Sequence, residues 1–245
     1  MNITKKVEFI KSWIQKYVDS MPVKAKSLVI GISGGIDSSV SSTLCAMTGM
    51  KTIVLSMPIK QNSSQHDLSL AHQEWLKKNY KNVEGHTIEL DGLFKSFEEI
   101  LNNFSNEHGM ANSRARLRMT TLYQVAAANK GIVVGTGNKV EDFGVGFYTK
   151  YGDGGVDISP IADCNKTEVW ELGKELGILE EIINAAPTDG LWDDGRTDEG
   201  QLGLTYKELE EAMNNENSVN REKYNSIRNA NLHKMEPIPV CKIPN

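Results

Sequence analysis

The chain has few cysteines, no excess of basic residues and no long apolar run, and each shortage excludes a class of protein. Its three cysteines, Cys45, Cys164 and Cys241, lie far apart and form no C-x-x-C pair. They predict neither a disulfide framework nor a zinc site, and they suit a reducing compartment. The net charge of −5 argues against a general nucleic-acid binder. No segment offers about 18 unbroken apolar residues, so we expect no membrane span.

The first twenty residues also lack the apolar core of a signal peptide, because Lys, Glu and Asp interrupt them. We therefore expect a cytoplasmic protein. With 245 residues, 39% of them hydrophobic and 24% charged, the chain can bury a sizeable core. No internal repeat or low-complexity linker divides it, so a single domain over residues 1–245 is the simplest organisation.

Apolar runs of strand length alternate with segments of helical periodicity. Strands are expected at 27–32, 51–58, 83–90 and 131–136, and helices at 7–18, 38–48, 65–79, 93–104, 113–129 and 166–176. Short β-rich runs joined by helical crossovers predict an α/β fold, a Rossmann-like parallel sheet with helices on both faces. The glycine-dense residues 137–160 are expected to be irregular, and the polar residues 187–203 to form a functional loop. Two charged helices and a short tail from His233 complete the prediction.

The sequence SGGIDSS follows the first expected strand and precedes a helix. Gly34 and Gly35 allow backbone N–H groups to turn toward a ligand without a side-chain clash. Hydroxyl donors flank them at Ser33, Ser38 and Ser39, and the helix adds its unpaired N–H groups and the positive end of its dipole. This pattern predicts a nest for an oxyanion, most naturally a phosphate.

A carboxylate in the middle of this turn, Asp37, would repel a bare phosphate. Its presence is explained if it holds Mg²⁺, which takes hard oxygen ligands and bridges to phosphate oxygens. The turn is not a Walker loop, because no Lys stands in it, and its glycines lack the G-x-G-x-x-G spacing of a dinucleotide fold. A glycine-serine turn that merely ends a core strand is the plain alternative.

The motif G-x-SGG-x-DSS resembles the signature loop of the ATP pyrophosphatase (PP-loop) superfamily, whose members cleave ATP to AMP and pyrophosphate. Further blocks are similar to ammonia-dependent NAD synthetases: NSRARLRM at 112–119, GTGNKVEDFGVGFYTKYGDGGVDISPI at 135–161, PTDGLWDDGRTDEGQLGLTY at 187–206, and the pair His233-Lys234. They run in family order and cover most of the chain. Between Glu141 and the TKYGDGG block this chain is one residue longer than the commoner family spacing.

The resemblance implies roles for particular residues. The ATP phosphates would be bound by Gly31, Ile32, Ser33, Gly34, Gly35, Ile36, Asp37 and Ser38, with further ATP contacts from Thr136, Lys166 and Thr188. Mg²⁺ would be held by Asp37 and Glu141, and deamido-NAD by Arg116, Lys150, Asp157, His233 and Lys234. Asp153 would handle the incoming ammonia and, with Asp37 and Lys166, form the catalytic set. After the second strand, Lys60 and Gln65 are open candidates for a contact to ATP.

Simple physical arguments bear on several of these assignments. Asp37 and Glu141 each follow an expected strand's carboxyl end, where open α/β sheets bind ligands. Lys166 at a helix N-terminus opposes the dipole, which favours a phosphate partner, although an exposed lysine is more often solvated surface. Asp153 and Asp157 could equally be turn formers in a glycine-rich loop.

The implied reaction is the last step of NAD biosynthesis, catalysed by a ligase that forms a C–N bond. The nicotinate carboxylate of deamido-NAD attacks the α-phosphate of ATP to give an acyl-adenylate and pyrophosphate. Ammonia then displaces AMP and gives NAD. ATP is a co-substrate and Mg²⁺ the cofactor. The ATP loop begins at residue 31, so we expect no glutaminase domain and free ammonia as the donor. A separate amidotransferase that supplies the ammonia stays open. The resemblance also implies a homodimer, with no nucleic-acid or membrane partner.

Three other functions remain open at this point. A tRNA-thiolating enzyme of the superfamily would carry a catalytic cysteine pair and a basic face. Another ligase, such as half of a GMP synthetase, would lack the TKYGDGG and LW…TDE blocks. A nucleotide sensor without catalysis would bind ATP without needing both Asp37 and Glu141.

Overall fold

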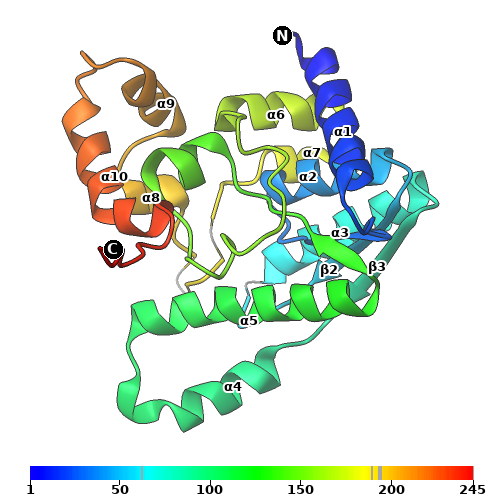
Figure 1. Ribbon diagram of the computed structural model, residues 1–245, viewed down its shortest axis with the longest axis horizontal. Coiled ribbons are helices and arrows are strands. Elements are labelled where there is room, and N and C mark those ends of the chain that lie inside the picture. Colours follow the sequence, from blue (N-terminus) through cyan, green and yellow to red (C-terminus); the bar gives the residue numbers. More distant parts are fainter. Residues whose placement is uncertain (62, 189, 193–194, 245) are drawn as a thin grey trace.

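A four-stranded parallel sheet organises the first half of the chain (Figure 1). The computed structural model describes residues 1–61, 63–188, 190–192 and 195–244. The strands are β1 (Ser27–Gly31), β2 (Lys51–Ser56), β3 (Val83–Thr87) and β4 (Gly131–Val133), in the order β3-β2-β1-β4. The predicted α/β fold is confirmed. Each strand ends one to three residues earlier than expected, because the last apolar residues of each run already belong to the loops at the sheet's edge.

The central strand β1 and its neighbour β2 are buried on both faces, as expected for a parallel sheet, whereas the edge strand β3 is largely exposed. Leu28 and Ile30 of β1 join one apolar cluster, and Val29 between them joins the other. The first cluster is covered by α1 (Ile3–Ser20), α2 (Ile36–Met47), α3 (Ser63–Asn79), α6 (Lys166–Glu175) and α7 (Glu180–Ile183). The second is covered by α4 (Asp91–Ile100) and α5 (Glu107–Ala128), with the short helix η1 (Asn102–Phe104) between them.

The C-terminal part forms a helical unit beside the sheet. It comprises α8 (Asp198–Leu202), α9 (Tyr206–Asn214) and α10 (Arg221–Met235), which pack with the π-helix η2 (Lys139–Val145). In Figure 1 these helices, orange to red, lie on the opposite side of the molecule from α1. Their shared cluster is a third, smaller apolar core, made of Val140, Val145, Leu202, Leu204, Tyr206, Leu209, Ala212 and Tyr224.

Several expectations for the second half are wrong in detail. The stretch 137–160 is not wholly irregular, because η2 occupies Lys139–Val145. The polar stretch 187–203 contains α8, and His233 and Lys234 belong to the last turn of α10, not to the tail. The short helix α7 was not expected. No helix within the described ranges is long and apolar enough to cross a membrane.

The strand order locates the site. The chain leaves β1 toward β2 on one side, whereas β4 pairs with β1 on the other side. Two loops therefore part at the carboxyl ends of β1 and β4. This is the switch point at which open α/β sheets form a crevice and bind their ligands.

Candidate active site

The loop after β1 lines a cavity of about 270 Å³ at this switch point, and all eight residues from Gly31 to Ser38 contribute to it. Gly34 has φ +91°, and a Cβ on it would lie 2.4 Å from the carbonyl oxygen of Gln65. Only glycine fits there. Gly35 caps α2 without any side-chain hydrogen bond to the helix N–H groups. Those N–H groups are thus available to an anion, as the sequence predicts.

The serine hydroxyls of the loop chiefly hold its own backbone. Ser33 Oγ accepts from the Gly35 N–H at 3.2 Å, and Ser38 Oγ donates to the Gly35 carbonyl at 3.0 Å. Ser39 Oγ also donates to that carbonyl, and its side chain is fully buried. The expectation that Ser39 offers its hydroxyl to a ligand is therefore wrong. The hydroxyls shape the nest, and the backbone provides most of its donors.

Three charged side chains from distant parts of the chain meet at the cavity. Lys166, the first residue of α6, places Nζ 2.5 Å from Asp37 Oδ2 and 2.8 Å from Glu141 Oε1. Its side chain is only 2% exposed, so Lys166 is not the solvated surface lysine that is common at helix ends. The two carboxylates offset the unfavourable helix dipole and the burial of the ammonium group.

Burial alone would lower the pKa of Lys166, but the charges of Asp37 and Glu141 outweigh it and raise the pKa above its usual value. Lys166 therefore stays cationic. For Glu141 the directions are reversed. Burial alone would raise its pKa, but the Lys166 charge and hydrogen bonds from Lys166 and Tyr206 lower it overall. The cavity thus holds fixed charges that can act on a nucleotide without rearranging water.

Two neighbours orient the carboxylates and were not singled out from the sequence. Asn138 Nδ2 donates to Asp37 Oδ1 at 3.0 Å, while its Oδ1 accepts from the backbone N–H groups of Val140 and Glu141. Tyr206 Oη donates to Glu141 Oε1 at 2.6 Å. Asn138 lies in the GTGN motif, which is a signal that the sequence offered. Tyr206 is the last residue of the family-like block at 187–206, but nothing in that block points to a contact with Glu141.

The donor set fits Mg²⁺ bound together with phosphate. Among the described residues, no group of three or more His, Cys, Asp or Glu side chains gathers into a cage. Asp37 and Glu141 both line the cavity, and each is within hydrogen-bond distance of the same ammonium group. Two carboxylates beside a phosphate nest are the ordinary protein contribution to Mg²⁺, whose other ligands are phosphate oxygens and water.

Other predicted residues line the same cavity. Thr136 follows β4, Thr188 lies in the polar loop, and Asp153 lies in the GDGG turn, where its Oδ1 accepts from the Thr149 N–H at 2.9 Å. Gln65 Nε2 donates to Thr188 Oγ1 at 2.7 Å. Of the two open candidates after β2, Gln65 thus lines the cavity, whereas Lys60 forms an ion pair with Glu98 at 2.8 Å.

An additional carboxylate, Asp142, lines the cavity next to Glu141. Burial raises its pKa well above the usual value, and the nearby charges of Asp153 and Glu141 add to this effect. The side chain was not among the predicted site residues.

The five residues predicted to bind the second nucleotide do not line this cavity. Arg116 on α5 is exposed, and its Nε donates to the Lys150 carbonyl at 3.3 Å. Lys234 Nζ donates to the Tyr148 carbonyl at 2.7 Å, next to exposed His233. The segment 148–150 therefore brings α5 and the end of α10 together. The result is a basic group of Arg116, Lys150, His233 and Lys234 outside the cavity.

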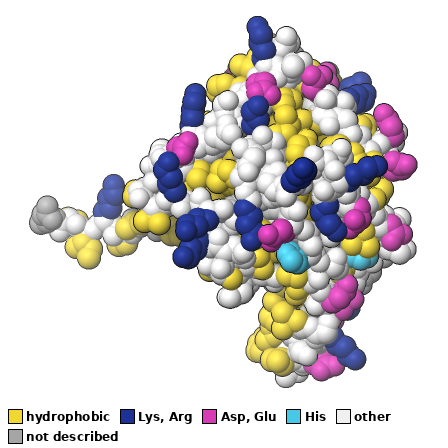
Figure 2. All heavy atoms as spheres, turned by 90° about the vertical axis from the view of Figure 1, so that its right-hand side faces the viewer, with side chains coloured by type: hydrophobic (Ala, Val, Ile, Leu, Met, Phe, Trp, Pro, Cys, Tyr) yellow, Lys and Arg dark blue, Asp and Glu magenta, His cyan; other side chains and the backbone are white. Residues whose placement is uncertain are grey.

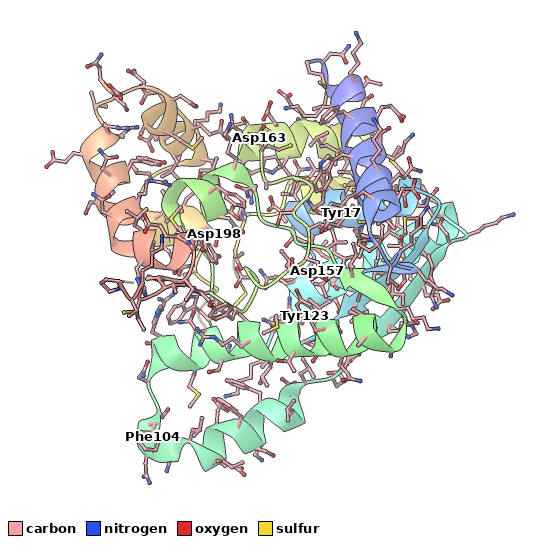
Figure 3. The ribbon with its side chains drawn as sticks, viewed as in Figure 1. Tyr17, Phe104, Tyr123, Asp157, Asp163 and Asp198 are labelled. Atoms are coloured by element: carbon pink, nitrogen blue, oxygen red, sulfur yellow. The ribbon has the colours of Figure 1, made fainter. Side chains whose placement is uncertain are left out.

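Asp157 has a structural partner on each oxygen. Its Oδ2 accepts from the Val133 N–H at 2.7 Å, and its Oδ1 accepts from Tyr123 Oη at 3.0 Å. Figure 3 shows Tyr123 and Asp157 pointing toward one another between α5 and the loop above it. Asp157 thus holds the loop against the end of β4, and its predicted contact to a nucleotide stays a prediction.

A π-helix lies beside the segment with the unusual spacing. η2 begins at Lys139, includes Glu141 and ends at Val145, four residues before Thr149. Turns of this kind occur often at functional sites. After η2, Thr149 and Lys150 lie beside α5, where they contact Asn112 and Arg116.

Comparisons with known proteins agree with this geometry. A family model described as NAD synthase matches residues 6–241. The chain is 41% identical over 234 residues to the NH(3)-dependent NAD(+) synthetase of Mesoplasma florum, which covers 94% of this chain and 89% of the relative. The solved structure of NMN synthetase from Francisella tularensis is similar with a TM-score of 0.88 and 32% identity, over 100% of this chain and 99% of that one.

The NH3-dependent NAD synthetase from Campylobacter jejuni, solved in complex with the nitrate ion, is similar with a TM-score of 0.79 and 25% identity, over 99% of this chain and 100% of that one. All of these matches span nearly the whole chain and include the glycine loop, Glu141 and Lys166. The chain therefore belongs to the NAD synthase family, among the NH3-dependent NAD synthetases.

Proposed function

We propose that this protein converts deamido-NAD to NAD with ATP and free ammonia, through an acyl-adenylate, and releases AMP and pyrophosphate. The observation that carries the proposal is the buried group of Asp37, Lys166 and Glu141 beside the glycine loop. A fixed ammonium group next to a phosphate nest suits a reaction in which negative charge moves onto a departing pyrophosphate. Relatives named NH(3)-dependent NAD(+) synthetase, 37–41% identical, support the acceptor and the donor.

In this mechanism the protein contributes positioning and charge. The N–H groups of the glycine loop bind the phosphates of ATP, and Thr136 and Thr188, which also line the cavity, help to fix the nucleotide. Lys166 neutralises the pyrophosphate as it leaves. Asp153 lies at the cavity wall, where it can orient the incoming nitrogen. No covalent intermediate on the enzyme is required.

Asp37 and Glu141 would hold Mg²⁺ in this scheme. Bound there, the ion would supply Lewis-acid neutralisation of phosphate charge. The two carboxylates come from the first turn of α2 and from η2, so the packing of η2 with α9 and α10 is a condition for binding the metal.

A second candidate acceptor is nicotinic acid mononucleotide, which lacks the adenylate half of deamido-NAD. The likeness to an NMN synthetase, with a TM-score of 0.88, favours it. The activation chemistry is the same for both acceptors, because both present a nicotinate carboxylate. The two acceptors differ in the adenylate half, which only deamido-NAD would present to the basic group outside the cavity.

We also propose that the protein is a homodimer. Apolar side chains gather on the projecting lower end of the molecule in Figure 2. Three of the exposed apolar side chains belong to α4 and η1: Leu93, Ile100 and Phe104 are between 53% and 81% exposed. Exposed apolar patches of this kind mark interaction surfaces. Light scattering after size-exclusion chromatography should give about twice the monomer mass.

One experiment with four reactions tests the function. The protein, ATP and Mg²⁺ are incubated with deamido-NAD or nicotinic acid mononucleotide, each with ammonium chloride or glutamine, and the products are separated by chromatography. NAD from deamido-NAD with ammonium alone supports the proposal. Faster amidation of the mononucleotide would make nicotinic acid mononucleotide the acceptor in place of deamido-NAD. Activity only with glutamine would overturn the ammonia assignment, and no product with either acceptor would overturn the function.

A further inference from the structure

Tyr206 is a buried side chain of the C-terminal helical unit that reaches the charged group at the cavity. It is the first residue of α9 and only 1% exposed. Its ring packs in the third apolar cluster, at right angles to Trp170, with ring centroids 5.7 Å apart. Its hydroxyl leaves that apolar environment and lies 2.6 Å from Glu141 Oε1 and 3.2 Å from Asp198 Oδ2.

The two contacts of the hydroxyl are not equivalent. A phenol carries one hydrogen, and the shorter distance shows that it goes to Glu141. Lys166 Nζ donates to the same oxygen at 2.8 Å, so Oε1 receives two donors, and together they fix the orientation of the carboxylate. The Tyr206 ring also lies under the Lys166 ammonium, 4.8 Å from Nζ to the ring centroid. One side chain thus contacts both the carboxylate and the cation.

We propose that Tyr206 is a positioning residue for the reaction: its hydroxyl fixes the rotamer of Glu141, and its ring holds Lys166 between the two carboxylates. It does not line the cavity and so acts through these two residues. The inference depends on the proposed function only for its kinetic readout. Side chains that orient the groups around a metal are typically worth about 10- to 100-fold in metal affinity or activity.

The opposing explanation is that Tyr206 only fills the third apolar cluster. The structure offers a matched control for this explanation. Tyr224 on α10 is 4% exposed, belongs to the same cluster and also bonds η2, but its hydroxyl meets the Gly144 carbonyl at 3.2 Å instead of a carboxylate. Tyr206→Phe and Tyr224→Phe each remove one hydroxyl and keep the ring.

The first measurement is steady-state kinetics of both variants with ATP, Mg²⁺, ammonium and the better acceptor. We expect Tyr206→Phe to lower kcat about 10-fold or more and to raise the Mg²⁺ concentration needed for half the maximal rate. KM for the acceptor should change less than about twofold, because the acceptor is not contacted. Tyr224→Phe should keep kcat within about twofold. Equal kcat losses in the two variants would overturn the proposal.

The second measurement needs no turnover. Mn²⁺ binding is followed by electron paramagnetic resonance in the presence of α,β-methylene-ATP, for wild type and both variants. Weaker Mn²⁺ binding in Tyr206→Phe alone supports the positioning role even if neither acceptor is amidated. Unchanged Mn²⁺ affinity and unchanged kcat would overturn that role while the proposed function stands.

A double-mutant cycle tests the route through Glu141. In a Glu141→Gln background, loss of the Tyr206 hydroxyl should have little further effect on Mn²⁺ affinity, because the carboxylate that it orients is gone. Additive losses would mean that Tyr206 acts independently of Glu141, and they would overturn the inference. Thermal unfolding of every variant identifies any that fail to fold.

Discussion

The charged residues of the site fall into two regions that differ in burial. Asp37, Lys166 and Glu141 are between 2% and 18% exposed, and the single Lys166 ammonium group pairs with both carboxylates. In the basic group, Arg116 and His233 are exposed, whereas Lys150 and Lys234 are half-buried. Arg116 and Lys234 donate to backbone carbonyl groups, and the two lysines lie over the rings of Tyr151 and Tyr148. The first region is a fixed part of the interior, and the second lies outside the cavity.

The proposed function would account for this difference. If ATP activates the carboxylate of the acceptor, that step is the same for every acceptor, and its charges can be built into the low-dielectric interior, where they act strongly. Recognition of the acceptor would depend on how many phosphates and rings it carries. Residues outside the cavity can change with the acceptor without disturbing the core, which would explain how this fold is shared by relatives named for NAD and for NMN synthesis.

Lys166→Met should break the buried region most severely. It leaves two buried carboxylates facing one another without their cation, which typically costs about 3–5 kcal/mol of unfolding free energy. Turnover should fall at least about 1000-fold, because the charge beside the departing pyrophosphate is lost. Urea unfolding and steady-state kinetics measure the two effects.

Lys139→Met is the control for that substitution. Lys139 begins η2, but its ion pair with Asp163 is at the surface, with the two side chains 40% and 96% exposed. Exposed pairs contribute at most about 1 kcal/mol, so stability and turnover should change little. If Lys166→Met unfolded no more easily than Lys139→Met, the buried ion pairs would not be part of what holds the site.

Asp37→Asn tests the metal role with a smaller disturbance of the fold. The amide keeps the shape of the side chain and removes one charge, so Lys166 retains Glu141 as its partner. We expect turnover to fall at least about 100-fold. Mn²⁺ binding in the presence of an ATP analogue should be lost as well. Substantial activity in this variant would remove Asp37 from the metal site.

The fold was largely predictable because its signals are local. All four strands and the helices between them follow from apolar periodicity, and the glycine loop follows from Gly34 and the residues around it. The π-helix η2 and the short helices α7 and α8 were missed. A π-helix is rare and carries no apolar periodicity that marks it, and helices of one turn are stabilised by tertiary contacts more than by periodicity.

The site was predictable only where it lies in a motif. Asp37, Glu141 and Lys166 were named from their places after strands or in family blocks, but the sequence suggested an exposed lysine, not a buried one. Tyr206 and Asp142 also lie in family-like blocks, but their contacts, like the structural partners of Asp157, depend on which elements pack together. Such contacts between segments distant in the sequence leave no local pattern.

A buried histidine makes the stability of the interior depend on pH. His72 on α3 is fully buried, its Nε2 lies 2.9 Å from Ser42 Oγ on α2, and burial lowers its pKa from 6.5 to about 4. The unfolded chain then binds a proton between pH 6.5 and 4 that the folded chain refuses. Stability should therefore fall as pH drops through this window, by about 3 kcal/mol from this group.

The measurement is urea unfolding at pH 7, 6, 5 and 4. His72→Gln should lose less stability on acidification than wild type, although it is less stable at pH 7. His233→Gln, at an exposed position of α10, should follow the wild-type curve. Parallel curves for wild type and His72→Gln would show that His72 does not contribute to acid sensitivity.

The smallest effect is expected in the exposed region, from Arg116→Ala. Arg116 is on the surface of α5 and contributes no charge to the cavity, so kcat should stay within about twofold of wild type. If it binds a phosphate of the acceptor, KM for the acceptor should rise about tenfold, the equivalent of one exposed charge-assisted hydrogen bond. Lys24→Ala, at another exposed position, should leave both constants unchanged.

A rise in KM for deamido-NAD but not for nicotinic acid mononucleotide would assign Arg116 to the adenylate half. An equal rise for both acceptors would assign it to the phosphate that they share. A fall in kcat at constant KM would contradict the division into two regions, because a residue outside the cavity would then take part in the chemistry.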